Sequence, residues 1–407
     1  MTEKNLNDRR RTLALVFCCV LMFSFSFSSA LYYTLQPLVL KHFDLTLTQS
    51  SWISICGSVG NMAINMLLMA TGDRFEKSRL LRILTAVLAV ALLLLGVAPG
   101  FALFIIAYAL NGIVGYWLDM LTTSYVSDLY GDQRSRYIGI LYTLFTVGSA
   151  LAPTFNTLVL ETLDLTWQHS YIISGIYTFA VAVVFAMLIR IVGKPQSAVE
   201  AAAEEKGEQV NNRLPVKEAL SNRNMIAFIL ASLTIAFSGY FSSALPLYFD
   251  YEGAEVFTTA MVNLIVTCSS VGAMISRFAY VPLADRINPI KYLRFQSLFC
   301  AACNLICLLV GKPSVWMALM FISGLLQGSS HTLTVVLTCD EYPDRSAAAT
   351  ATTALFTGFA YMAVTPIMNF VAEKTSFFLA MIIPIGFSVL TWVVYRFVYV
   401  ERKKAAQ

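Results

Sequence analysis

Charged side chains are scarce in this sequence. Asp, Glu, Lys and Arg make up 13% of the 407 residues, about half the fraction that a soluble protein uses to cover its surface. The apolar set AVILMFWYC makes up 57%, or about 232 positions, and twelve membrane spans of about 20 residues need about 240. The composition therefore excludes a string of soluble domains and predicts a polytopic membrane protein.

Motifs for catalysis and nucleotide binding are missing as well. The sequence contains no HExxH, no GxSxG and no GxxxxGK[ST], which argues against a zinc protease, a serine hydrolase and an ATP-driven pump. The net charge of +4 is too small, and its distribution too one-sided, for a nucleic-acid-binding protein. We expect neither an enzyme nor a bound cofactor.

The eight cysteines lie in or beside apolar runs, so they predict no disulfide framework. Cys300, Cys303 and Cys307 would share one helix face, but no His or carboxylate accompanies them in that run. We interpret them as small packing residues, not as metal ligands. The N-terminus shows no small-residue cleavage site after a short apolar core, so the first apolar run is interpreted as a retained span.

Long apolar runs divide the chain into twelve expected spans. None alternates with period two as a barrel strand would, and helices satisfy their own backbone in lipid, so each run is predicted to be helical. The runs fall at 12–40, 48–71, 80–98, 101–128, 138–160, 168–192, 225–249, 256–283, 292–311, 314–338, 347–371 and 375–399. The expected fold is an all-α membrane protein with twelve transmembrane helices.

Basic residues predict the orientation of these helices. With both termini in the cytosol, only Lys41, Lys312 and Lys374 of the 28 Lys and Arg residues fall outside. This distribution predicts that both termini lie in the cytosol. The short loops and the compact size favour the cytoplasmic (inner) membrane of a bacterium.

One sizeable polar stretch, residues 194–222, separates two sets of six runs. We expect an N-terminal six-helix bundle over residues 1–193, a cytosolic linker with a short surface helix over 194–222, and a C-terminal six-helix bundle over 223–407. A signalling receptor on such a scaffold would need a larger cytosolic domain than this linker.

The two halves repeat each other. The sequence Phe-Ser-Ser-Ala-Leu occurs at residues 27–31 and again at 241–245, and Asp-Arg occurs at 73–74 and at 285–286. Three further matches, from Asp128 with Asp340 to Asn156 with Asn369, follow in the same order, all with offsets between 211 and 214. An internal duplication predicts two pseudo-symmetric bundles.

Twelve helices in two sets of six, with short basic loops after the second and eighth, resemble the major facilitator superfamily. The family pattern in these loops contains Asp-Arg, which is present here as Asp73-Arg74 and as Asp285-Arg286, although Met69 and Glu76 replace two of its glycines. The resemblance implies two bundles that rock about a mid-membrane cavity. It also implies that the four Asp-Arg residues hold the bundles together on the cytosolic side in one state.

The run 138–160 contains the stretch from Gly148 to Pro153, which resembles the antiporter signature of this superfamily, but Ala152, Asn156 and Thr157 depart from it. Residues 112–119 are similar to one helix of the proton-coupled hexose permeases of the same superfamily. Antiport and symport both stay open on these motifs.

Two ionisable residues are expected deep in the membrane at repeat-equivalent positions. Asp119 lies nine residues before Asp128, and His331 lies nine residues before Asp340, which corresponds to a depth of about 13 Å in a helix. Deep ionisable groups usually mark ion pathways. We predict that Asp119 and His331 exchange protons across the pseudo-two-fold axis, the alternative being a polar packing contact.

Arg277 is the third deep charge, eight residues before Asp285. It could bind a carboxylate or phosphate of a substrate, extend along the helix to the cytosolic interface, or pair with Asp285. Polar and aromatic side chains on the first, fourth, seventh and tenth runs are further candidates for substrate binding. They are Tyr32, Gln36, Asn111, Trp117, Tyr240 and Gln327.

The sequence thus predicts a secondary active transporter that moves a small organic solute by alternating access, with protons as the coupling ion. Symport is the first interpretation, and proton-coupled efflux of drugs or metabolites by antiport is the alternative. The expected partners are the solute, protons and the lipid bilayer, without nucleic acid. A monomer is expected because one duplicated chain supplies a complete pathway.

Overall fold

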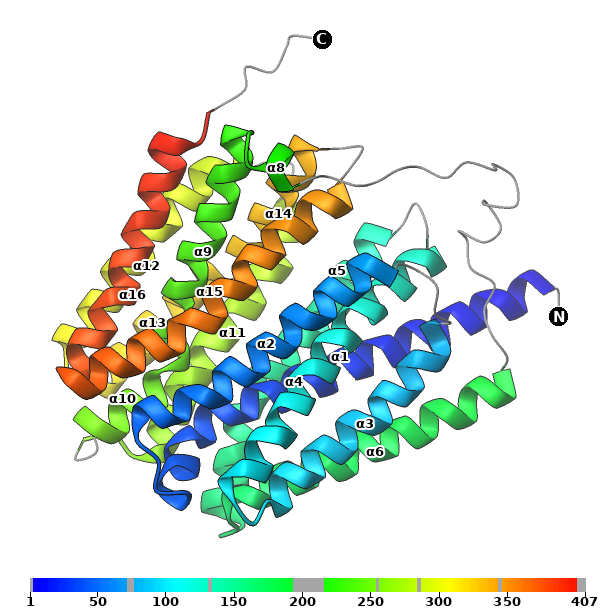
Figure 1. Ribbon diagram of the computed structural model, residues 1–407, viewed down its shortest axis with the longest axis horizontal. Helices are drawn as coiled ribbons and strands as arrows, with labels where there is room; N and C mark the ends of the chain where they lie inside the picture. Colours follow the sequence, from blue (N-terminus) through cyan, green and yellow to red (C-terminus); the bar gives the residue numbers. More distant parts are fainter. Residues whose placement is uncertain are drawn as a thin grey trace. The chain divides into compact units, whose positions relative to one another are not determined.

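The computed structural model describes residues 3–71, 77–130, 134–192, 216–253, 256–283, 287–342 and 346–400. The chain divides into two compact units, Met1–Val210 and Asn211–Gln407 (Figure 1). The predicted linker, residues 194–222, lies outside the described residues as far as residue 215.

Unit 1 consists of helices that correspond to the first six predicted spans. They are α1 (Glu3–His42), α2 (Leu47–Thr71), α3 (Lys77–Val97), α4 (Phe101–Tyr130), α5 (Arg134–Thr157) with the π-helical turn η2 (Leu158–Thr162), and α6 (Trp167–Val192). In this unit α1 packs against α5, α4 and α6, while α3 packs against α4 and α6.

Unit 2 begins with the one-turn helix α8 (Val216–Ala219), followed by the remaining predicted spans. These are α9 (Arg223–Ser243), α10 (Leu245–Glu252), α11 (Thr259–Leu283), α12 (Pro289–Leu309), α13 (Pro313–Gln327), α14 (Ser330–Glu341), α15 (Ser346–Lys374) and α16 (Phe377–Val393) with η4 (Val394–Val398). The principal pairs are α11 with α13, α12 with α16, and α9 with α15 and α16.

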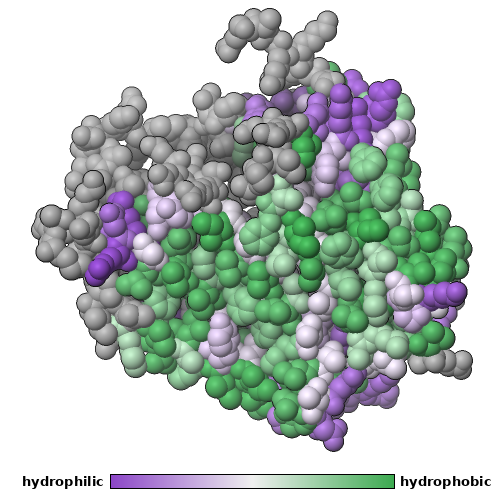
Figure 2. Space-filling model, turned by 180° about the vertical axis from the view of Figure 1, so that it is seen from behind, coloured by the Kyte–Doolittle hydropathy of each residue, from purple (hydrophilic) through white to green (hydrophobic). Residues whose placement is uncertain are grey.

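The described helices have the length and composition of membrane spans. Ten of them are long and apolar enough to cross a membrane, and the other two predicted spans correspond to α2 and to the α13–α14 pair. Apolar side chains cover the middle of the visible face, and hydrophilic ones gather at its margins (Figure 2). Soluble proteins seldom expose so much contiguous apolar surface, so the lipid bilayer is the solvent for these faces.

Two predicted spans are each made of two helices instead of one. The run 225–249 breaks at Ala244, and Pro246 lies in the first turn of α10, where its missing N–H has no intrahelical partner to lose. The run 314–338 breaks at Gly328 and Ser329. With 15 residues, α13 spans only about 22 Å, which is less than the hydrocarbon thickness of about 30 Å.

Close helix packing occurs at repeat-equivalent glycines. A Cβ added to Gly324 of α13 would collide with the backbone of Ser269 on α11, and one added to Gly272 of α11 would collide with the carbonyl of Phe321. Their repeat mates, Gly112 and Gly60, lie on the corresponding α4 and α2, where a Cβ on Gly112 would lie 3.2 Å from a backbone atom of α2. Small residues let membrane helices approach to backbone contact.

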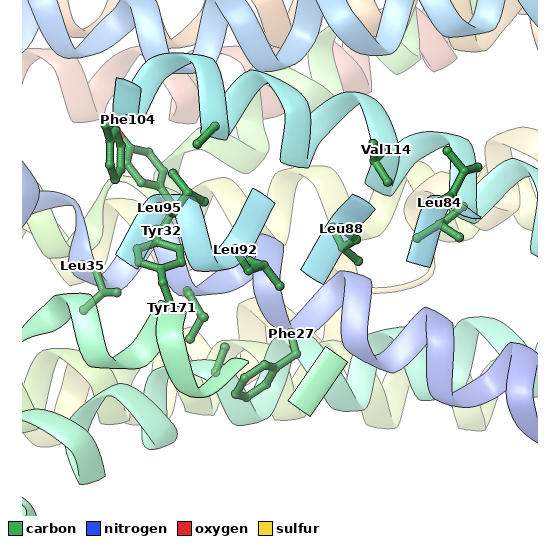
Figure 3. Close-up of a cluster of buried hydrophobic side chains, with 14 of the residues drawn as sticks. Phe27, Tyr32, Leu35, Leu84, Leu88, Leu92, Leu95, Phe104, Val114 and Tyr171 are labelled. Atoms are coloured by element: carbon green, nitrogen blue, oxygen red, sulfur yellow. The ribbon is translucent and has the colours of Figure 1, made fainter. Parts of the chain in front are cut away.

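A buried apolar cluster from α1, α3, α4 and α6 forms the core of unit 1 (Figure 3). It runs along α3 through Leu84, Leu88, Leu92 and Leu95, and Tyr32, Phe104 and Tyr171 gather near the Leu95 end. This rigid core determines which faces of α1 and α4 remain for polar groups.

Candidate functional site

Asp119 lies on α4 in unit 1. Its Oδ1 is buried and has no hydrogen-bond partner among the described residues. Tyr142 of α5 makes a side-chain hydrogen bond with the same carboxyl group. A buried carboxyl oxygen without a partner is costly, and this cost falls when the group holds a proton. The geometry therefore suits a carboxyl group that gains and loses a proton.

Polar side chains continue along the same face of α4. Asn111, Asp119 and Thr123 are spaced by eight and four residues, so they follow one slowly turning stripe of the helix. Asn111 is only 3% exposed, and its Oδ1 and the Thr123 Oγ1 are buried without partners within the described ranges. Gly115 lies between them, and the ring of Phe25 on α1 occupies the space where a Cβ would stand. The stripe presents several unmet hydrogen-bonding atoms inside unit 1.

Trp117 and the α1 candidates differ from this stripe in their surroundings. Trp117 lies on another side of α4, packs against the apolar cluster, and its Nε1 is buried without a partner in the described structure. Tyr32 is 1% exposed within the same cluster, with its ring 4.8 Å from that of Tyr108, and Gln36 is buried. Trp117 and Asn111 are six residues apart, so helical periodicity places them on different sides of α4. The sequence prediction grouped them together because it did not take this periodicity into account.

In unit 2, Arg277 points its side chain at the interruption between α13 and α14. Its Nε donates to the carbonyl oxygen of Gly328 at 3.1 Å. Two other side chains bind the neighbouring carbonyls: the Tyr292 hydroxyl donates to Leu326 at 3.0 Å, and Ser330 Oγ donates to Gln327 at 2.7 Å. The last carbonyls of α13 are thus satisfied by side chains, as backbone at membrane depth requires.

His331 lies in the first turn of α14, three residues after the carbonyl that Arg277 binds. Its side chain is exposed on the surface of unit 2. It interacts electrostatically with Arg277, as does Tyr361 of α15. The structure therefore brings Arg277, His331 and Tyr361 into one group, which we call the basic cluster. No motif or spacing in the sequence points to Tyr361.

Tyr240 and Gln327 are engaged in contacts between helices. The Tyr240 hydroxyl donates to Asn369 Oδ1 at 2.8 Å, and Gln327 Nε2 donates to Ser238 Oγ at 2.8 Å. Asn156, the repeat mate of Asn369, likewise donates to the carbonyl of Leu31 on α1, at 3.2 Å. A buried amide therefore ties the fifth span of each unit to the first, a role that the repeat pattern alone did not reveal.

The four residues predicted to act in gating, Asp73, Arg74, Asp285 and Arg286, lie outside the described residues. Asp119 belongs to unit 1 and His331 to unit 2, so their pairing stays a prediction. No group of three or more His, Cys, Asp or Glu side chains suited to a metal occurs in the described part of the chain. Cys300, Cys303 and Cys307 are buried on α12, and Cys300 Sγ lies 3.6 Å from the carbonyl oxygen of Ser323 on α13.

Known proteins resemble this chain in both sequence and fold. The sequence matches the Major Facilitator Superfamily over residues 16–262 and 254–407. It is 29% identical over 210 residues to the multidrug efflux pump LfrA of Mycolicibacterium smegmatis, a match that covers 51% of this chain and only 39% of the pump.

Solved structures of two transporters share the fold at low identity. A bacterial homologue of the human lysosomal transporter Spinster, inward-facing and occupied, superposes with a TM-score of 0.72 at 12% identity, covering 96% of this chain and 97% of that one. The E. coli fucose:proton symporter FucP superposes with a TM-score of 0.64 at 17% identity, covering 96% of this chain and 100% of that one. This chain belongs to the Major Facilitator Superfamily and is a multi-pass membrane transporter, not an enzyme.

Proposed function

We propose that this protein is a proton-coupled secondary transporter of a small organic solute, working by alternating access and most simply as a symporter. The observation that supports this proposal best is the buried Asp119 Oδ1, which has no hydrogen-bond partner in the described structure. The proposal includes a location in the cytoplasmic membrane with both termini in the cytosol, in agreement with the distribution of Lys and Arg.

The physical argument concerns the charge on Asp119. A carboxylate shielded from water is unfavourable, so the side chain favours the protonated form when its surroundings are dry. Access to one aqueous phase would let it release the proton there. If solute binding and access change together, the proton and the solute move in a fixed ratio.

His331 occupies the repeat-equivalent position in unit 2 and is the second proposed proton site. An imidazole changes its charge near neutral pH more readily than any other side chain. In this proposal Asp119 carries the coupled proton and His331 responds to the same cycle from its own unit. The Asp-Arg residues 73–74 and 285–286 are proposed to close the cytosolic side.

Antiport is the alternative, supported by the partial similarity to a protein described as a multidrug efflux pump. Symport is supported by the departures of Ala152, Asn156 and Thr157 from the antiporter signature. The two mechanisms differ in one measurable respect, which is whether protons and solute cross the membrane in the same direction.

The test is proton movement in proteoliposomes that contain a pH-sensitive dye, challenged with solute pools. The variant is Asp119→Asn, and the matched control is Asp44→Asn. Asp44 is an exposed carboxylate in the same unit with a φ of 52°, a conformation that Asn accepts readily. We expect solute-driven proton flow in the wild type and in Asp44→Asn, and its loss in Asp119→Asn with solute binding retained.

Proton flow in the direction of the solute identifies a symporter, and opposed flow identifies an antiporter. Coupling that persists undiminished in Asp119→Asn would contradict the assigned role of this residue. Solute uptake without a proton signal in the wild type would contradict proton coupling altogether.

A further inference from the structure

We propose that unit 2 binds the transported solute through a negatively charged group, a carboxylate or a phosphate, at the basic cluster of Arg277, His331 and Tyr361. This inference rests on the proposed transport function and names the chemical class of its substrate. It would make the protein a transporter of organic anions.

Arg277 is held at the depth of the helix interruption. The bond from its Nε to the Gly328 carbonyl directs the side chain to the junction of α13 and α14. Holding Nε also orients the plane of the guanidinium group. A planar guanidinium matches the geometry of carboxylate and phosphate oxygens and can bind them in bidentate fashion.

The other two members of the cluster lie on the surface of unit 2. Tyr361 is 49% exposed, and the His331 side chain is exposed as well. His331 belongs to a span, and an imidazole on a lipid-facing surface at that depth is costly. The face that carries the basic cluster is therefore best assigned to the aqueous pathway, where a solute can reach it.

The charges of the unit 2 spans agree with an anionic solute. No Asp or Glu occurs between residues 259 and 284, or between residues 313 and 339, whereas Arg277 and His331 fall inside these ranges. Arg277 is the one permanently charged side chain within these two ranges, so the charge beside the junction of α13 and α14 is positive. A solute with negative charge gains from this charge, and a cationic drug would be repelled.

Side chains of α11 and α12 engage the start of α14. The helix has 12 residues, and its N-cap residue Ser329 makes no side-chain capping bond. Ser329 Oγ bonds Ser276 instead, at 2.8 Å from Ser276 Oγ and 3.1 Å from the Ser276 carbonyl oxygen. Gln296 reaches the same turn, since its Nε2 donates to Ser330 Oγ. Gln296 is 3% exposed, and its Oε1 has no partner within the described residues. The turn thus retains an unmet hydrogen-bond acceptor, which pairs with an N–H or O–H of a solute and not with its anionic oxygens.

The test is solute binding to the full-length purified protein, measured by thermal stabilisation in detergent. The probes are pools of mono- and dicarboxylates and of phosphate monoesters, each compared with its neutral methyl ester or amide, together with a pool of quaternary amines. The variants are Arg277→Gln and Arg277→Lys. The matched control is Arg294→Gln, because Arg294 also donates from Nε to a backbone carbonyl of unit 2, that of Tyr395 at 2.9 Å.

We expect a carboxylate or phosphate pool to stabilise the wild type and Arg294→Gln, while the neutral analogues do not. Arg277→Gln should weaken binding by about tenfold to a hundredfold, the loss expected when a charge-assisted hydrogen bond is removed, and Arg277→Lys should weaken it less. The pool that responds distinguishes carboxylates from phosphates.

Failure of all anion pools to bind the wild type would overturn the inference, and so would equal binding by the neutral analogues or unchanged affinity in Arg277→Gln. These outcomes differ from a failure of the proposed function. A neutral solute that moves together with protons would leave proton coupling intact and reject the anion. Anion binding that depends on Arg277, in a protein that moves no protons with the solute, would support the anionic substrate and reject proton coupling.

Discussion

Substitution of Gly324 by Ala tests the close packing of α13 against α11. An added Cβ would collide with the carbonyl oxygen, carbonyl carbon and Cα of Ser269. All three are backbone atoms, so the collision is relieved only if the two helices separate. Overpacking costs about 1–3 kcal/mol, and the higher helix propensity of Ala returns about 1 kcal/mol. Because the obstacle is backbone and cannot rotate away, the upper cost of about 3 kcal/mol applies, and the net loss is about 2 kcal/mol.

Gly386→Ala is the matched control. Gly386 lies on α16 in the same unit, and nothing stands within 4 Å of the position of an added Cβ. This variant should gain about 0.5–1 kcal/mol from helix propensity alone. For a unit of this size the apparent Tm of Gly324→Ala should fall by about 4–8 °C and that of Gly386→Ala should rise by about 1–4 °C.

The assay is thermal unfolding of the purified protein in detergent, followed by circular dichroism. Adding Ser269→Gly should not rescue Gly324→Ala, because the obstructing atoms remain in place. A Tm of Gly324→Ala equal to or above that of the wild type would refute the assignment of α11–α13 as a backbone-to-backbone contact.

Two further predictions concern stability and accessibility. Tyr240→Phe should destabilise unit 2 by about 1–3 kcal/mol, because it leaves the buried Asn369 Oδ1 without the hydroxyl donor at 2.8 Å. Asn369→Leu in the same protein removes the amide as well and should recover part of the loss, as measured by a double-mutant cycle of unfolding midpoints. A thiol-reactive fluorophore should label the four buried cysteines only on unfolding, and rapid labelling of the native protein at these positions would contradict their packing. They are Cys18, Cys300, Cys303 and Cys307.

Much of the fold could be predicted from the sequence because its physical cause is local. Each apolar run needs a helix to satisfy its backbone in lipid, whatever its neighbours are. The repeat then divides these helices into two sets of six. The depth of Asp119 and of His331 also follows from counting residues along a helix, since rise per residue does not depend on packing.

The interruption at Gly328 and Ser329 was not predicted, although Gly-Ser-Ser is a turn signal. In a membrane span such a break persists only if other groups take over the freed carbonyls. The groups that do so, Tyr292 and Arg277, are 34 and 51 residues away in sequence. A short stretch of sequence around Gly328 contains no information about partners so distant along the chain.

The sequence by itself determined the class of this protein, its helices and the presence of rare ionisable groups inside them, because hydrophobicity and helical rise act through neighbours along the chain. Only the tertiary structure decided what each of those groups contacts. It directed Arg277 to a helix break with His331 and Tyr361 nearby, placed Tyr142 beside Asp119, and engaged Tyr240 and Gln327 in packing. The reason is that side-chain partners are chosen by how helices distant in sequence pack, and glycines such as Gly272 and Gly324 set how closely they do so.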